Sequence, residues 1–314
     1  KQPIADWSAY HQELLKRIGI DQTLSSKIIE RAKKKPKRIV FAEADNYKIL
    51  MAAQVLIDEG IAFPILLGNK KRILELQEKH KLDLADCPII DPREETEKVE
   101  LFAKRLYEKR QRRGLTYQEA EKQVLNRNTY GAMMLEYGEA DALISGLTHD
   151  YSKTISPALQ IIGTAPDVKR VAGMYIIINK RGTFFFADAT VNVNPSAEEL
   201  VEIIGLACRG VKFFDFEPRV AVLSYSNFGS SKGDVPDKTR KAVQLARAKF
   251  PNLVIEGDVQ ANVALNTELQ QEMYPFSALA GAGANTLVFP TLESGNIAYK
   301  LLMEIGGAEA IGPI

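Results

Sequence analysis

A polar loop after the apolar run 220–223 carries the residue types best suited to holding an anion. It reads SYSNFGSSKGD and leads into a basic helix. Backbone N–H groups around Gly229, together with hydroxyls and an ammonium group, would cradle a phosphate. The segment lacks the GxxxxGK[ST] pattern of a P-loop, so a polar surface turn remains the alternative. The loop residues predicted to contact an anion are Ser226, Asn227, Gly229, Ser230, Ser231 and Lys232.

Two carboxylates, Glu43 and Asp45, follow an expected strand at 38–42 and precede a helix. Carboxylates stabilise the positive end of a helix dipole, so capping is the favoured interpretation. The alternative is that they face a cleft from the carboxyl end of the strand.

A histidine and a basic run are the other polar features. His149 lies in the loop SGLTHDY, either at a site or simply solvated, and the three histidines have no HxxH or HExxH spacing that would predict a metal centre. No nucleophile elbow is evident either. In KRLYEKRQRRG, Arg105, Lys109 and Arg112 share one helical face, which is typically solvated, whereas Arg110 is a candidate anion ligand.

The elements that must position these residues alternate between strand and helix, which predicts an α/β fold with largely parallel strands. One exception is the tight connection NKRG, which predicts an antiparallel hairpin between 171–178 and 183–187. This mixture favours two α/β domains with a cleft between them. The other expected strands are 38–42, 64–67, 88–90, 142–144, 220–223, 253–256 and 286–289.

One helix start is well marked in NPSAEELVEIIGLA. Ser196 and Glu199 have the spacing of a capping box, and the apolar residues that follow fall on one helical face. This helix is expected to pack on a sheet, with its N-terminus in a strand-to-helix loop of the kind that binds ligands.

Composition narrows the class of protein. The chain has 314 residues, 46% of them apolar and 26% charged, and a formal net charge of +1. These values indicate an ordinary globular protein rather than a nucleic-acid binder. No apolar run predicts a membrane span, so we expect no membrane partner and a cytoplasmic location. Cys87 and Cys208 lie far apart and are expected to be core residues.

Several segments, in order, resemble the phosphate acetyltransferase family from about residue 27 to the end of the chain. They include AEADNYKILMAA, GEADALISG, PALQIIGTAPDVKRVAGMY, FADATVNVNPSAEELVEI and LVFPTLESGNIAYKLLMEIGGAEAIGPI. The form SNFGSS is similar to the phosphotransacetylase-like C-terminal region of bacterial hybrid NADP-dependent malic enzymes. The opening KQPIADWSAYHQEL resembles the join to a malic enzyme catalytic domain, which would be the preceding partner.

The resemblance implies an isocitrate or isopropylmalate dehydrogenase-like fold with a coenzyme A site in the cleft. Residues 1–20 are expected to be a linker. A first α/β domain is expected from 21–151 plus 291–314, incomplete at its C-terminal end. A second, dimerising domain is expected from 152–290, with the apolar hairpin supplying contact surface for a homodimer or higher oligomer.

The resemblance also implies departures from the family's catalytic pattern. The arginine of the family's RPALQII segment corresponds to Ser156, and a lysine before the loop glycine corresponds to Phe228, whereas Arg110 matches the family's arginine. The Ser-Arg-Gly segment that carries catalysis in the family is expected beyond GAEAIGPI. Losing positively charged donors around a developing oxyanion slows acyl transfer strongly.

We therefore expect a regulatory module that binds acetyl-CoA, coenzyme A or phosphate without catalytic residues, cofactor or metal of its own. NADP and a divalent metal would belong to the malic enzyme domain alone. The alternatives are an active phosphate acetyltransferase and an oligomerisation module that binds no ligand. Besides the loop residues, the expected ligand-binding residues are Arg110, Ser145, Thr148 and Asn296.

Overall fold

The computed structural model describes residues 20–314, and the chain divides into two compact units. The first unit comprises Lys27–Thr164. The second comprises Ala165–Ile314 and the described residues up to Ser26. Helix α2 (Ile20–Lys34) contains the boundary between them. Each unit has its own sheet, so the prediction of two α/β domains is confirmed.

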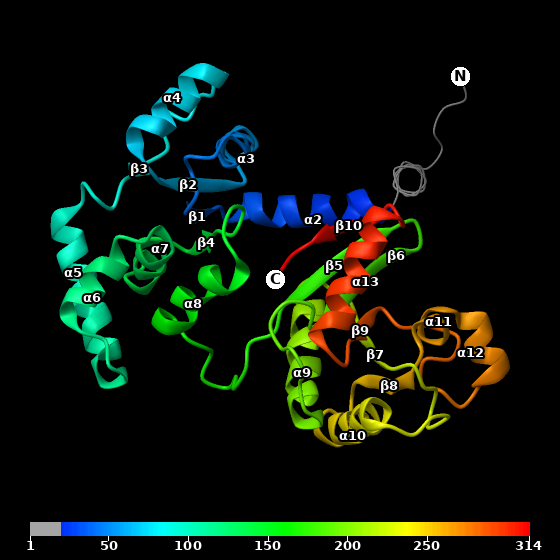
Figure 1. Cartoon of the computed structure of the whole chain (residues 1–314). Helices are drawn as coiled ribbons and strands as arrows, with labels where there is room; N and C mark the ends of the chain where they lie inside the picture. Colours follow the sequence, from blue (N-terminus) through cyan, green and yellow to red (C-terminus); the bar gives the residue numbers. More distant parts are fainter. Residues whose placement is uncertain (1–19) are drawn as a thin grey trace, which may run out of the picture. The chain divides into compact units, whose positions relative to one another are not determined.

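The first unit is built on a four-stranded, all-parallel sheet in the order β3-β2-β1-β4 (Figure 1). Its strands are β1 (Lys37–Phe41), β2 (Ala62–Leu67), β3 (Ile89–Ile90) and β4 (Ala142–Ile144). Parallel strands need crossover connections, which here are helical. The helices are α3 (Tyr47–Asp58), α4 (Lys70–His80), α5 (Thr96–Arg110), α6 (Tyr117–Val124), α7 (Arg127–Glu136) and α8 (Tyr151–Ile161), with a 3₁₀ turn at Gln111–Arg113.

The second unit has a six-stranded mixed sheet in the order β10-β5-β6-β9-β7-β8 (Figure 1). Its strands are β5 (Met174–Asn179), β6 (Gly182–Ala187), β7 (Arg219–Leu223), β8 (Val254–Val259), β9 (Thr286–Val288) and β10 (Glu309–Ile311). Strands β6, β9, β7 and β8 are parallel to one another. The helices are α9 (Ala197–Phe213), α10 (Asp234–Lys249), α11 (Ala261–Leu265), α12 (Thr267–Met273) and α13 (Leu292–Glu304).

Two local predictions in this unit are confirmed. Strands β5 and β6 form the antiparallel hairpin, with Asn179 opposite Gly182 at its tip. The Ser196 side chain accepts a hydrogen bond from Glu199 N, and the Glu199 carboxylate accepts one from Ser196 N, which completes the capping box of α9. The apolar face of α9 is buried, as its spacing predicted.

The structure differs from the expected domain bounds at both ends of the second unit. Helix α8, residues 151–161, lies in the first unit, so the boundary follows Thr164 instead of Tyr151. The C-terminal residues 291–314 belong to the second unit instead of the first. The reason is strand β10, which the sequence analysis did not predict: it pairs antiparallel with β5 and completes that edge of the sheet.

The hairpin is an internal part of its own sheet. Ile176, Ile177 and Phe185 are completely buried within the second unit, and both neighbouring edges of the hairpin are paired with β10 and β9. These apolar residues of the hairpin therefore fill the core of one chain. Cys87 and Cys208 are buried free thiols, as expected. Among residues 20–314, no helix has the length and apolar character needed to cross a membrane.

Candidate functional site

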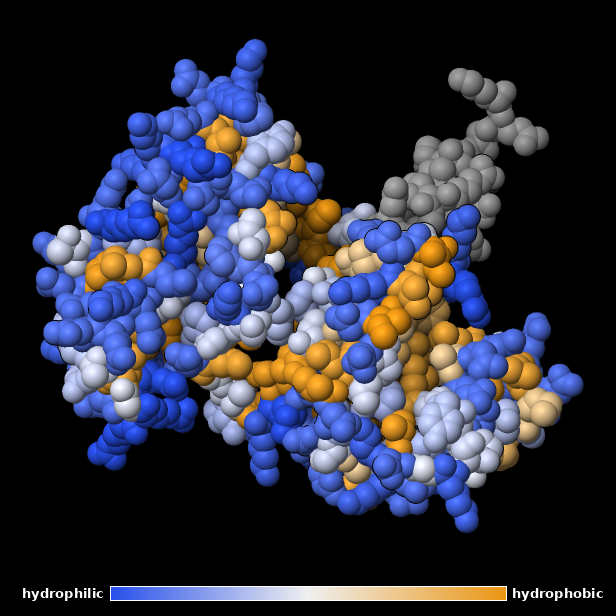
Figure 2. All heavy atoms as spheres, viewed as in Figure 1, coloured by the Kyte–Doolittle hydropathy of each residue, from blue (hydrophilic) through white to orange (hydrophobic). Residues whose placement is uncertain are grey.

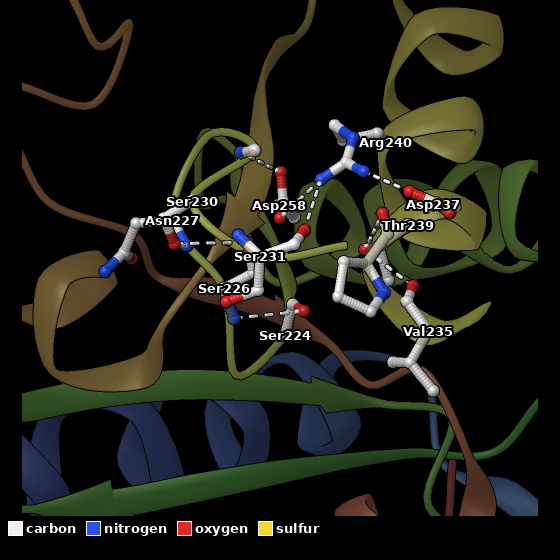
Figure 3. Close-up of polar contacts among 12 residues, drawn as sticks. Ser224, Ser226, Asn227, Ser230, Ser231, Val235, Asp237, Thr239, Arg240 and Asp258 are labelled. Atoms are coloured by element: carbon white, nitrogen blue, oxygen red, sulfur yellow. Dashed lines mark hydrogen bonds and ion pairs between the residues drawn. The ribbon is translucent and has the colours of Figure 1, made fainter. Parts of the chain in front are cut away.

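The polar loop between β7 and α10 is a compact turn built over a buried carboxylate (Figure 3). Asp258 lies at the end of the neighbouring strand β8 and is fully buried. Its Oδ1 accepts a hydrogen bond from Gly229 N at 3.1 Å, and its backbone carbonyl accepts one from Phe228 N at 2.7 Å. Gly229 has φ of 87°, in the left-handed region that glycine adopts without steric cost. Strand β8 therefore determines the shape of the loop.

The sequence predicts that the backbone N–H groups of this loop hold a phosphate. In the structure, these N–H groups instead donate hydrogen bonds to other groups of the protein. Gly229 N donates to Asp258, Ser230 N donates to Asn227 O at 2.9 Å, and Ser231 N donates to Ser226 Oγ at 3.1 Å. Ser226 is fully buried, so its hydroxyl is an internal support of the turn. Because all three amides already donate hydrogen bonds within the protein, none of them is available to an anion in this structure, contrary to the expectation.

Arg240 of α10 neutralises the buried carboxylate from the other side (Figure 3). Its Nη1 lies 3.2 Å from Asp258 Oδ2 and also donates to the Ser231 carbonyl at 3.3 Å, while its Nη2 pairs with Asp237. A buried carboxylate needs such a partner because taking an isolated charge out of water is costly. Arg240 thus links the loop, strand β8 and the first turn of α10.

Lys232 is the one predicted loop residue whose functional group remains available to a ligand. Its side chain is exposed, and among residues 20–314 its ammonium group forms no ion pair. Ser230 is also exposed, but its Oγ accepts a hydrogen bond from Asn227 N at 3.0 Å. Asn227 is itself engaged, since its Oδ1 accepts from Gln260 N at 2.8 Å. The loop can therefore present an exposed cation beside a turn whose other groups are already bonded.

The first unit holds a second polar constellation, centred on Glu43. This carboxylate is 4% exposed and accepts hydrogen bonds from the backbone N–H groups of Gly146, Leu147 and Thr148 at 2.7–2.8 Å. The Thr148 hydroxyl and His149 Nδ1 also contact its Oε1, the latter at 3.0 Å. The loop SGLTH therefore wraps around a single side chain that is distant in sequence.

The hydrogen bonds determine the charge of Glu43. Burial by itself raises the pKa of this carboxyl, but the hydrogen bonds from Thr148, His149 and Leu147 outweigh burial and lower the pKa to about 2. Glu43 is consequently ionised at neutral pH. An ionised carboxylate only accepts hydrogen bonds, so His149 bonds to Glu43 in a form whose Nδ1 carries a proton.

The capping interpretation of Glu43 and Asp45 is wrong, and so is that of His149 as a solvated residue without a partner. Helix α3 is capped by Asn46, whose side chain accepts from Lys48 N. Glu43 lines a cavity, in agreement with the alternative interpretation, and Asp45 forms two hydrogen bonds with Arg127 at 2.7 and 2.9 Å. Short polar side chains such as asparagine cap helices better than a carboxylate already bonded elsewhere.

The remaining residues that were predicted to bind the ligand lie at different places in the two units. Thr148 bonds to Glu43, and Ser145 Oγ is buried with no hydrogen-bond partner among the described residues.

Arg110 is the last residue of α5. The nearby Arg105 and Lys109 both form ion pairs with Glu136. Asn296 on α13 donates to Ala189 O at 3.2 Å and lines a cavity of about 520 Å³. Arg110, Ser145 and Thr148 belong to the first unit, and the others belong to the second.

Three important residues were missed by the sequence analysis: Asp258, Arg240 and Arg127. Asp258 lies at the carboxyl end of strand β8, a position comparable to that of Glu43 just after β1. Arg240 lies among other cations of α10, Arg127 is the first residue of α7, and nothing in their spacing distinguishes them. Their roles come from partners 18 and 82 residues away, which a local pattern does not reveal.

Comparison with known proteins agrees with this architecture. A family described as phosphate acetyl/butaryl transferase matches residues 23–314. A phosphate acetyltransferase of Clostridium acetobutylicum is 39% identical, covering 93% of this chain and 89% of that protein. An NADP-dependent malic enzyme of Haemophilus influenzae is 36% identical and matches the whole chain, which spans only 42% of that enzyme.

Among solved structures, a phosphotransacetylase from Streptococcus pyogenes is similar with a TM-score of 0.84 and 35% identity, covering 93% of this chain and 89% of that one. The family match spans both units, and the relatives include both kinds of protein that the sequence resembles. On this evidence the chain belongs to the phosphate acetyl/butaryl transferase family.

Proposed function

We propose that this chain is a regulatory and oligomerisation module of an NADP-dependent malic enzyme, and that it binds acetyl-CoA or a related metabolite. The observation that carries the proposal is the full-length match to the Haemophilus influenzae malic enzyme, of which this chain spans 42%. Malate oxidation, NADP and a divalent metal would then belong to another part of such an enzyme. The ligand would act by preferring one conformational state of the assembly.

The replacement at Ser156 supports binding without efficient acetyl transfer. The resemblance implies an arginine at this position, whereas the Ser156 hydroxyl is within α8 and accepts a hydrogen bond from Gln160 Nε2 at 2.9 Å. Acetyl transfer develops negative charge on the acetyl oxygen, and a helix hydroxyl that is already bonded stabilises it poorly. Removing one such donor typically costs about two to three orders of magnitude in rate.

Lys232 is the loop residue we propose as the phosphate contact. Because the amides of residues 229–231 bond internally, the ammonium of Lys232 has to supply the attraction. A charge-assisted hydrogen bond to phosphate is about twice as strong as a neutral one. This geometry suits an exposed diphosphate group better than an enclosed inorganic phosphate.

We expect Lys232→Ala to weaken acetyl-CoA binding about tenfold, as calorimetry on the purified chain would show. The matched control is Lys180→Ala, which removes another exposed lysine from the β5–β6 turn of the same unit and should leave the affinity unchanged. Ser230→Ala is a less specific test, since the Ser230 hydroxyl also supports the turn through Asn227. Equal loss in both lysine variants would contradict the assignment.

The same preparation should form acetyl phosphate from acetyl-CoA and phosphate only negligibly. Robust turnover would instead establish an active phosphate acetyltransferase, an alternative favoured by the 39% identity to the Clostridium acetobutylicum enzyme over 89% of its length. Absence of acetyl-CoA binding at millimolar concentration would leave a structural oligomerisation module. The internally bonded amides of the loop favour that third function.

Self-association is proposed to use α13. Figure 2 shows an apolar strip over this helix, and its exposed members are Ile297, Leu301 and, just after the helix, Ile305, at 53%, 50% and 83% exposure. Spacing of four residues places them on one helical face. An exposed apolar face of this kind commonly marks a protein–protein contact.

We expect sedimentation velocity at micromolar concentration to show a dimer or larger species. Leu301→Glu should shift the chain towards monomer, because it places a charge in the middle of the strip. Met273→Glu, at a 57% exposed apolar residue of α12, is the control and should not change the assembly. A monomeric unmodified chain would refute self-association altogether.

A further inference from the structure

A cavity of about 610 Å³ in the second unit lies at the edge of the sheet opposite the Lys232 loop. Its wall is formed by the C-terminal half of α9, by the turn 250–253 that joins α10 to β8, and by Asp167. The turn leads into the amino end of β8, whereas the Lys232 loop follows the carboxyl end of the parallel neighbour β7. The cavity is therefore separate from the contact proposed for acetyl-CoA.

The uncharged part of the wall is apolar except for Asn252. It includes Leu206 of α9 together with Phe250 and Leu253 of the turn. Cys208 also lines the cavity, and burial raises the pKa of its thiol to about 12, so the thiol stays neutral. Such a wall favours a ligand with an aromatic or aliphatic body, because burying apolar surface is favourable.

Gly205 allows the Phe250 ring to approach α9 closely. A Cβ at position 205 would lie 2.9 Å from Phe250 Cζ, which is closer than van der Waals contact allows. Glycine inside a helix is less stable than alanine by roughly 0.5–1 kcal/mol, so its presence here indicates a packing requirement. The position of the ring, and with it the shape of the cavity, depends on the absence of a side chain at position 205.

The charges of the wall leave one cation without a carboxylate. Arg209 pairs with Asp167 at 2.8 Å. Lys249 pairs with Glu202, and its ammonium also lies 5.4 Å from the centroid of the adjacent aromatic ring. Lys212, in the last turn of α9, is exposed and forms no ion pair among residues 20–314. A ligand with one negative charge would balance it.

We propose that this cavity binds a small monocarboxylate whose carboxylate accepts a hydrogen bond from Lys212 and whose apolar body packs against Phe250 and Leu206. The volume lies within the range of about 300–1,000 Å³ found for small-molecule sites. A ligand with several negative charges would also meet the two carboxylates of the wall, which disfavours a polyphosphate. Because the cavity and the Lys232 loop lie at opposite edges of the sheet, failure of one proposal would leave the other intact.

The test is a calorimetric titration of the whole chain with hydrocinnamate, a carboxylate joined to a phenyl ring by two methylene groups. Hydrocinnamyl alcohol is the uncharged analogue, and acetate is the carboxylate without an apolar body. We expect saturable binding of hydrocinnamate with a dissociation constant of about 1 mM or lower, and about tenfold weaker binding of the alcohol and of acetate. Absence of saturable hydrocinnamate binding at millimolar concentration, or equal affinity for the alcohol, would overturn the proposal.

Lys212→Met removes the charge and keeps a side chain of similar length. We expect the affinity for hydrocinnamate to fall about tenfold and the affinity for the alcohol to stay unchanged, since only the carboxylate bonds to the ammonium. Lys180→Met is the matched control, because it removes an exposed lysine of the same unit that does not line the cavity. Unchanged hydrocinnamate affinity in Lys212→Met, or an equal loss in Lys180→Met, would contradict the assignment.

Gly205→Ala tests the apolar wall. Its methyl group must displace the Phe250 ring, so hydrocinnamate and the alcohol should both bind several-fold more weakly. Gly210→Ala is the control in the same helix, because a Cβ there would meet Met174 Cε at 2.7 Å and Gly210 does not line the cavity. If circular dichroism shows that Gly205→Ala is unfolded, Phe250→Leu replaces it. Undiminished affinity in the folded variant would refute the site.

Discussion

Glu43→Gln should lower the free energy of unfolding by about 3 kcal/mol at neutral pH. Its carboxylate accepts three backbone hydrogen bonds from residues 146–148 and two more from side chains. An amide retains one acceptor oxygen but turns its NH₂ group towards donors that it cannot bond. Chemical denaturation of the purified chain, monitored by circular dichroism, measures this difference.

The same hydrogen bonds to Glu43 make the free energy of unfolding depend on pH in the acidic range. Hydrogen bonds lower the pKa of Glu43 from its usual 4.5 to about 2, so the unfolded chain binds this proton more readily than the folded one. The contribution is therefore complete above pH 4.5 and is lost as the pH falls from about 4.5 towards 2. Glu43→Gln should remove this part of the acid dependence, and the two stability curves should converge at low pH.

Asp141→Asn is the matched control for Glu43. Hydrogen bonds from the Arg38 side chain and backbone also lower the pKa of Asp141 to about 2, but this pair lies on the surface. Water and salt screen exposed ion pairs, so this variant should be much less destabilised than Glu43→Gln. If the two variants lost similar amounts of unfolding free energy, the burial of Glu43 would not explain its contribution to stability.

Arg240→Met should lower the free energy of unfolding by about 3–5 kcal/mol, because it leaves a buried charge without its partner. Asp258 is fully buried and forms its ion pair with Arg240 at 3.2 Å. The Ser231 carbonyl would lose its hydrogen bond as well. We therefore expect faster amide exchange in residues 226–233, measurable by hydrogen–deuterium exchange, together with the loss of stability.

Two further variants distinguish the buried pair from the other contact of the same arginine. Asp237→Ala removes the partner whose side chain is 59% exposed, and it should have little effect on stability. Adding Asp258→Asn to Arg240→Met removes the uncompensated charge but keeps an acceptor for Gly229 N, and it should restore much of the lost stability. A double variant as unstable as the single one would show that the charge is not the cause.

Many features of this protein are local and could be predicted. Within residues 20–314, the period of apolar residues identified nine of the ten strands, the turn NKRG identified the antiparallel hairpin, and Ser196 with Glu199 identified a helix start. Each of these depends on residues within a few positions of one another. The ordered segments also identified the family, because their agreement extends over most of the chain.

The sequence by itself determined the α/β class, two sheets, the family and the polar loops in which chemistry was to be sought. Only the tertiary structure decided that Glu43 binds residues more than one hundred positions away and that Asp258 occupies the loop amides. It also placed β10 beside β5, which assigns the C-terminal residues to the second unit. The physical reason is that strand order and register bring distant side chains together, and a buried carboxylate takes whichever donors that packing places within reach.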